Sequence, residues 1–162
     1  KSEVFKMPHP ITPKIGARIM SLSDPTHKMS KSDPKGDIFL KDDLKIARKK
    51  IMSAVTDLGS DIIYDPVNKP GISNLIQIYS AMNDLTLEET VEKFKDCHRY
   101  GEFKGAVADS VCAFLSDFQE KYKQIIESGI IDQVLADGAK KAREVANKTL
   151  VRAQKVVGLY VK

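Results

Sequence analysis

Apolar residues recur every three or four positions through most of the chain beyond residue 41, which is the pattern of helices that bury one face. A first helix should begin after Asp42 or Asp43, either of which can cap it, and a second should span about residues 73–82. A short third helix should follow Thr86, because Thr86 and Glu89 have the spacing of a capping box. The first helix also carries a basic face, formed by Lys41, Lys45, Arg48 and Lys49.

The two longest apolar stripes lie in the second half of the chain. One predicts a core helix that ends near Gly129, with the apolar positions Phe103, Val107, Val111, Phe114, Leu115, Phe118, Tyr122, Ile125 and Ile126. A last helix from about Ile131 should bury Val134, Leu135, Ala142, Val145, Ala146, Ala153, Val156 and Val157. Glycines interrupt the helical pattern over residues 100–105, so that segment is interpreted as a hinge. These patterns predict a mostly α fold with a helical bundle.

The first forty residues differ from the rest because prolines limit them to short regular structure: Pro8, Pro10, Pro13, Pro25 and Pro34. Residues Ala17–Leu22 should form a brief strand. The change in character near residue 41 predicts a boundary, with one domain portion over residues 1–40 and a second over residues 41–162.

Composition places the chain among ordinary globular proteins. Its 162 residues are enough for one domain with a core and part of a second, and the net charge of +4 permits an anionic partner without requiring one. No apolar run is long enough to span a bilayer, and no signal-peptide pattern opens the chain, so we expect a cytoplasmic protein. Neither the two cysteines nor the three histidines have metal-ligand spacing, and we expect no metal site in this chain.

The candidate chemistry is concentrated in Lys28-Met29-Ser30-Lys31-Ser32. Asp24-Pro25 and Asp33-Pro34 bracket these residues, and because an X-Pro step disfavours helix before it, the segment should be a loop. Two ammonium groups, two hydroxyls and successive backbone N–H groups suit the binding of a polyphosphate. The alternative is a solvated loop in which Ser32 or Asp33 caps a helix.

The pentapeptide reads KMSKS, which is the second signature of class I aminoacyl-tRNA synthetases. With its flanks, residues 15–34, it closely resembles the loop of the tryptophanyl-tRNA synthetase family. The resemblance covers nearly the whole chain and includes residues 49–51, 54–57, 69–75, 78–79 and 100–104. It implies ligation of L-tryptophan to tRNA(Trp) through an aminoacyl-adenylate made from ATP. Because the chain begins at Lys1 without a nucleotide-binding unit before the loop, we expect it to be the C-terminal part of a larger protein.

The resemblance also implies roles for parts of the chain. Residues 1–40 would be the edge of a class I Rossmann-like catalytic domain carrying the loop, and residues 41–162 a helical domain for tRNA anticodon-region recognition. ATP would contact Ile19 on the adenine side, together with Lys28, Met29, Ser30, Lys31 and Ser32. Lys28 and Lys31 would act in catalysis by stabilising the departing pyrophosphate, with Lys31 the stronger candidate.

The family further implies Mg²⁺ with the ATP substrate and a homodimer. The first class I signature and the tryptophan pocket are absent from these residues, so tryptophan would bind the missing N-terminal half. This chain alone is therefore expected to be inactive.

A basic stripe on the last predicted helix is a candidate contact for tRNA phosphates, formed by Lys141, Lys148, Arg152 and Lys155. A solvated face is the alternative, because Glu144 lies in the same sector. Three alternatives to the tryptophanyl interpretation stay open: a tyrosyl-type fragment, an RNA-binding helical module, and a helical protein-interaction domain without catalysis.

Overall fold

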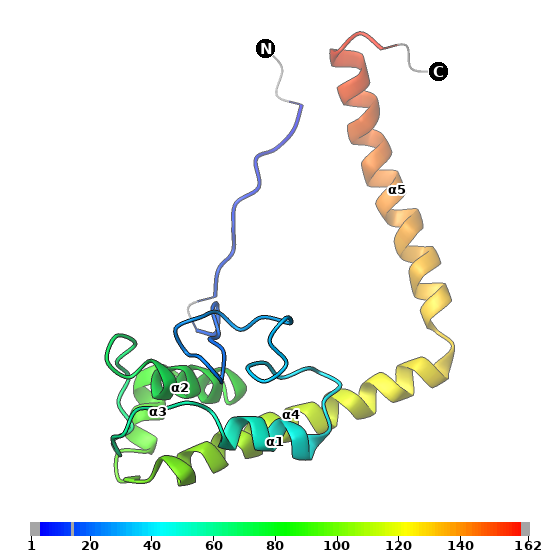
Figure 1. Cartoon of the computed structure of the whole chain (residues 1–162). Coiled ribbons are helices and arrows are strands. Elements are labelled where there is room, and N and C mark those ends of the chain that lie inside the picture. Colours follow the sequence, from blue (N-terminus) through cyan, green and yellow to red (C-terminus); the bar gives the residue numbers. More distant parts are fainter. Residues whose placement is uncertain (1–3, 14, 160–162) are drawn as a thin grey trace. The chain divides into compact units, whose positions relative to one another are not determined.

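Five α-helices make up the regular structure of the computed structural model, which describes residues 4–13 and 15–159: α1 Leu44–Met52, α2 Pro70–Met82, α3 Leu87–Lys93, α4 Tyr100–Ser128 and α5 Ile131–Val156 (Figure 1). The prediction of a mostly α chain is confirmed. The described residues divide into two compact units, one comprising residues 12–121 and the other residues 4–11 with 122–159. None of the helices in these residues combines the length and apolar character needed to cross a membrane.

Local signals set the ends of the helices. The Asp43 carboxylate accepts the Lys45 N–H at 2.8 Å and caps α1. At α3 the predicted capping box is present, with the Glu89 N–H donating to the Thr86 hydroxyl at 3.1 Å and the Thr86 N–H donating to the Glu89 carboxylate at 2.8 Å. Helix α2 begins at Pro70, three residues before the predicted start, because a proline in the first turn forfeits no intrahelical hydrogen bond.

Helix α2 lies at the centre of the core of the unit of residues 12–121. It buries residues around most of its circumference, including Ile72, Leu75 and Ile76, whereas α1 contributes Ala47 and Ile51. Helix α4 contributes Phe103, Val107, Ala108, Val111 and Leu115. Each fully buried aliphatic or aromatic side chain contributes about 1.5–3 kcal/mol, so this cluster is the main stabilising element of the unit.

The segment of residues 100–105 is the start of α4, so its interpretation as a hinge is wrong. Phe103 is fully buried, with its ring centroid 4.8 Å from that of Phe94 in an edge-to-face arrangement. The packing of this aromatic side chain outweighs the weak helix propensity of Gly101 and Gly105.

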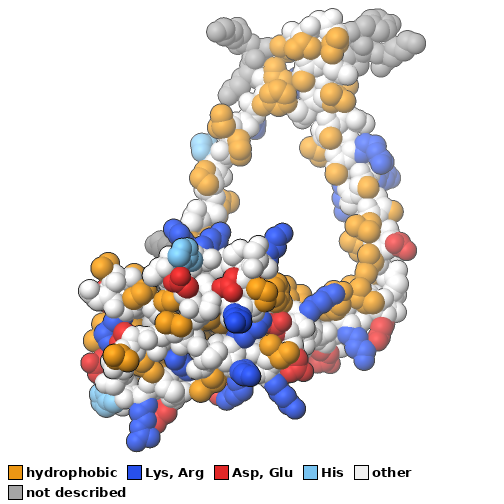
Figure 2. Space-filling view, viewed as in Figure 1, with side chains coloured by type: hydrophobic (Ala, Val, Ile, Leu, Met, Phe, Trp, Pro, Cys, Tyr) orange, Lys and Arg blue, Asp and Glu red, His pale blue; other side chains and the backbone are white. Residues whose placement is uncertain are grey.

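The predicted burial of the last apolar stripes is also wrong for the described residues. In α4 the stripe is buried as far as Leu115, but Phe114, Tyr122, Ile125 and Ile126 are exposed. Helix α5 buries no residue, and Figure 2 shows hydrophobic side chains at the surface along it. The predicted core positions of α5 are exposed or half-buried: Val134, Leu135, Ala142, Val145, Ala146, Ala153, Val156 and Val157. Periodicity identifies the apolar face of a helix, but burial also requires a surface to cover it.

Candidate nucleotide-binding loop

The segment that carries the KMSKS signature folds back on itself. The Met29 N–H donates to the Ile19 carbonyl at 3.0 Å, and Met20 and Lys28 form an isolated antiparallel bridge. The strand predicted at Ala17–Leu22 is therefore wrong, because pairing is limited to this bridge and no described residue forms a longer ladder with the segment. The fold-back brings Ile19 next to the signature.

The five signature residues separate into two kinds. Lys28, Ser30, Lys31 and Ser32 are exposed, whereas Met29 is half-buried and packs against the core. The apolar side chain thus anchors the loop, and the cationic and hydroxyl side chains remain accessible to an anionic ligand.

The alternative in which Ser32 or Asp33 caps a helix is wrong. The Ser32 N–H donates to the Ser30 hydroxyl at 3.4 Å, and the Asp33 N–H to the Ser30 carbonyl at 2.8 Å, which are contacts of a tight turn. The next helix is α1, and Asp43 caps it.

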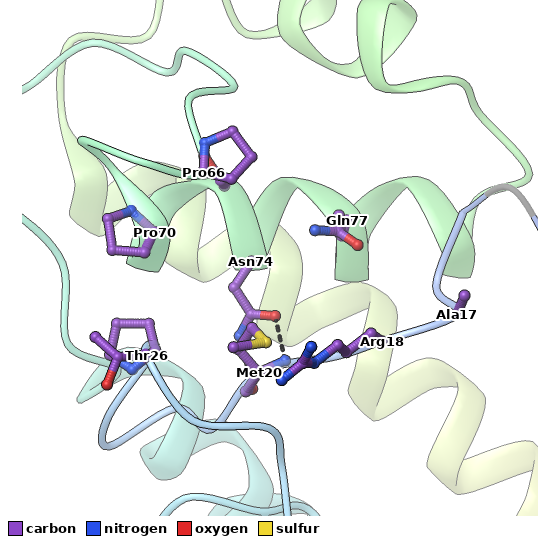
Figure 3. Close-up of a pocket in the computed structure, with 10 residues that line it drawn as sticks. Ala17, Arg18, Met20, Thr26, Pro66, Pro70, Asn74 and Gln77 are labelled. Carbon is purple, nitrogen blue, oxygen red and sulfur yellow. Dashed lines mark hydrogen bonds between the residues drawn. The ribbon is translucent and has the colours of Figure 1, made fainter.

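Asn74 ties the loop to α2 (Figure 3). Its side-chain oxygen accepts the Met20 N–H at 2.8 Å, and its side-chain nitrogen donates to the Met20 carbonyl, also at 2.8 Å. Asn74 is only 2% exposed, so loss of this pairing would leave buried polar groups unsatisfied. The helical pattern alone did not identify Asn74 as a loop contact, although an asparagine among the apolar positions of a core helix is a signal that could reveal it.

Two hollows border the segment of residues 17–20. Arg18 and Met20 line one of about 470 Å³, with Asn74 and Gln77 projecting from α2 toward them (Figure 3). Ile19 lines the other, of about 270 Å³, together with Met29 and largely apolar side chains of α2 and α4. Ile19, the predicted adenine-side residue, and Met29 of the signature therefore share one apolar hollow.

Lys31 and Asp37 line a third hollow, of about 690 Å³. Asp37 is 4% exposed, and its Oδ1 atom has no hydrogen-bond partner. Burial raises the pKa of Asp37, although the Lys50 ammonium acts in the opposite direction. The Lys50 ammonium donates to the Asp37 backbone carbonyl at 2.8 Å and to the Asp42 carboxylate at 2.7 Å. No motif in the sequence pointed to Asp37.

A protein-family profile described as "tRNA synthetases class I (W and Y)" matches residues 1–116. The chain belongs to this family. It is 46% identical over 160 residues to the tryptophan–tRNA ligase of Bacillus subtilis (strain 168), covering 98% of this chain and 48% of that protein. The chain thus spans about half the length of the curated relatives it matches. The resemblance to the tryptophanyl-tRNA synthetase family is confirmed.

Solved structures give the same assignment. Tryptophanyl-tRNA synthetase from Mycoplasma pneumoniae matches with a TM-score of 0.81 and 29% identity, covering 91% of this chain and 45% of that one. The enzyme from Campylobacter jejuni complexed with ADP and tryptophan matches with a TM-score of 0.62 and 25% identity, covering 96% of this chain and 48% of that one.

Three segments that carried the resemblance to the synthetase family meet at one polar cluster. The Tyr100 hydroxyl donates to the Asp57 carboxylate at 2.9 Å, and the Lys69 ammonium donates to the Tyr100 oxygen at 3.0 Å. Burial raises the pKa of Asp57, but hydrogen bonds from Gly59, Tyr100 and Lys69 together bring it below its usual value. Burial is also the main cause that raises the pKa of Tyr100. The cluster joins the start of α2 to the start of α4, which is a structural role.

The basic stripe lies on α5, where Lys141, Lys148, Arg152 and Lys155 are all exposed. The Arg152 guanidinium donates to the Val4 carbonyl at 2.8 Å. Among the described residues, no cluster of His, Cys, Asp or Glu side chains has the geometry of a metal site.

Proposed function

We propose that this chain supplies the signature loop, which closes over ATP, and the helical domain of a tryptophan–tRNA ligase. Residues 1–40 would form the edge of its Rossmann-like catalytic domain, and residues 41–162 its helical tRNA-recognition domain. The observation that carries the proposal is the fold-back at Met29, which brings Ile19 beside a signature whose Lys28 and Lys31 side chains remain exposed.

The chemistry follows from the charges of the loop. The tryptophan carboxylate displaces pyrophosphate from the α-phosphorus of ATP, and negative charge grows on the leaving group. Preorganised ammonium groups of Lys28 and Lys31 would stabilise that charge more in the transition state than in the ground state. The Ser30 and Ser32 hydroxyls would donate hydrogen bonds to phosphate oxygens. Ile19 and Met29, which share the apolar hollow, would receive the adenine side.

Mg²⁺ would accompany ATP, where it neutralises triphosphate charge. It binds proteins through one or two carboxylates and completes its shell with waters and phosphate oxygens. The signature loop offers ammonium and hydroxyl groups, so none of its residues is assigned to hold the ion.

The remaining partners belong to the complete enzyme. Tryptophan would bind residues outside this chain, and the assembly would be a cytoplasmic homodimer. This chain alone would not form the adenylate, because it lacks the first class I signature.

Amino acid-dependent ATP–pyrophosphate exchange in a complete synthetase carrying this chain tests the proposal. We expect exchange with tryptophan and at most trace exchange with tyrosine. Exchange with tyrosine alone would support the tyrosyl alternative, and the absence of both would favour a non-catalytic helical module.

A charge reversal on α5 tests the tRNA contact. Changing Lys148, Arg152 and Lys155 to glutamate should weaken tRNA(Trp) binding, because contacts with phosphates would be lost. Each lost contact should also lower the salt slope of log K by roughly 0.7–0.9. Filter binding across a salt series measures both quantities, and tryptophan-dependent exchange should not change. Glu144→Gln is the matched control, because removal of a negative charge from the same sector should slightly strengthen binding. An unchanged salt slope would assign the stripe to a solvated face.

A further inference from the structure

The side chain of Asp33 closes the base of the signature loop. Its Oδ2 atom accepts hydrogen bonds from the Ser23 hydroxyl at 2.8 Å and from the Ser21 hydroxyl at 3.1 Å. Both serines precede the loop of residues 24–32, whereas Asp33 follows it directly. A single carboxylate therefore joins the two ends of the loop, and Ser21 is itself buried.

Gly36 makes room for this closure. A Cβ atom at Gly36 would lie 2.0 Å from the Ser21 hydroxyl oxygen and 2.1 Å from Asp33 Oδ2, which is far inside van der Waals contact. Backbone hydrogen bonds also close the base of the loop. The Leu22 N–H donates to the Gly36 carbonyl at 2.8 Å, and the Gly36 N–H donates to the Asp33 carbonyl at 3.1 Å. A side chain at this position would force the hydroxyl and carboxylate apart.

The other carboxylate of the loop makes only local contacts. Asp24 accepts hydrogen bonds from Thr26 and pairs with His27, and these contacts lower the pKa of Asp24 to about 2. The hydrogen bond from Ser23 is the main cause that lowers the pKa of Asp33. Both groups are ionised at neutral pH, but only the Asp33 carboxylate connects the two ends of the loop. Asp24 is therefore a matched control of the same charge.

We propose that Asp33 is a positioning residue for adenylate formation, which acts through Lys28 and Lys31 by closing the base of the loop that carries them. This inference rests on the proposed function of the loop. When both ends of the loop are joined, its backbone is restricted, and the ammonium groups of Lys28 and Lys31 are held in defined positions. With the base open, they sample positions that miss the leaving pyrophosphate, and a misplacement of about 1 Å can slow an enzyme by about 10²-fold.

Amide hydrogen exchange on this chain tests the closure without reference to ATP. Asp33→Asn replaces the charged acceptor by a weaker neutral one. We expect exchange of the Leu22 and Met29 amides to rise about tenfold or more, whereas amides of α2 should not change. Asp24→Asn should have a much smaller effect on these two amides. Unchanged exchange in Asp33→Asn would overturn the closure and the inference with it.

Single-turnover adenylate formation in a complete ligase tests the positioning. Asp33→Asn should lower the rate constant at saturating ATP about tenfold or more and leave tryptophan affinity unchanged. Gly36→Ala should act in the same direction. Adding Ser23→Ala to Asp33→Asn should cause little further loss, because both changes remove the same contact.

The outcomes separate this inference from the proposed function. A smaller active fraction with an unchanged rate constant would indicate a structural role and overturn the positioning. If adenylate formation is slow in Lys31→Ala but has a normal rate constant in Asp33→Asn, Asp33 is not a positioning residue, and the proposed function stands. Normal rate constants of adenylate formation in both variants would contradict the proposed function and this inference together.

Discussion

Lys31→Ala in a complete ligase carrying this chain should slow adenylate formation by about 10²–10³-fold, the usual effect of removing one preorganised charge-stabilising group. Lys31 is exposed on a loop anchored by Met29, so its loss should leave the fold intact. Tryptophan affinity should hardly change, because the amino acid would bind outside this chain. Lys31→Arg should restore only part of the rate, since a planar guanidinium replaces a compact ammonium in a tight loop.

Single-turnover kinetics at saturating ATP distinguishes a slower chemical step from weaker nucleotide binding. Lys35→Ala is the matched control, because Lys35 is an exposed cation just outside the signature. Its rate should stay close to that of the unmodified enzyme. A normal rate constant in Lys31→Ala would remove Lys31 from the mechanism.

Phe103→Ala should lower the free energy of unfolding of this chain by about 3–5 kcal/mol, because a large buried ring would be replaced by a cavity. Phe103 is 0% exposed and packs against Phe94 and Tyr79, with ring centroids 4.8 and 6.2 Å away. Urea denaturation followed by circular dichroism measures the change.

Phe114→Ala is the control on the same helix. Phe114 belongs to the same apolar stripe in the sequence, yet it is 46% exposed. Its replacement should therefore cost no more than about 1 kcal/mol. Equal losses for the two variants would contradict the assignment of Phe103 to the core and Phe114 to its edge.

Features that depend on near neighbours could be predicted from the sequence. The caps at Asp43 and Thr86 and the end of α4 near Gly129 involve residues within a few positions of one another, so the sequence pattern contains all the participants. The signature loop was recognisable for the same reason. Its five residues are contiguous, and flanking prolines restrict the backbone locally.

The burial of the apolar stripes and the polar support of the loop depend on contacts between residues far apart in the chain. Phe103 and Leu135 both belong to the apolar stripes of their helices, but Phe103 is fully buried and Leu135 is 64% exposed, because burial depends on a second surface. Asn74 is separated from Met20 by 54 residues, and no spacing rule connects them. The contact between Ser21 and Asp33 is possible only because Gly36 has no side chain. This requirement arises only once the backbone has folded back. Local sequence therefore specifies the helices and the chemistry of the loop, whereas the folded chain specifies which residues hold that loop in place.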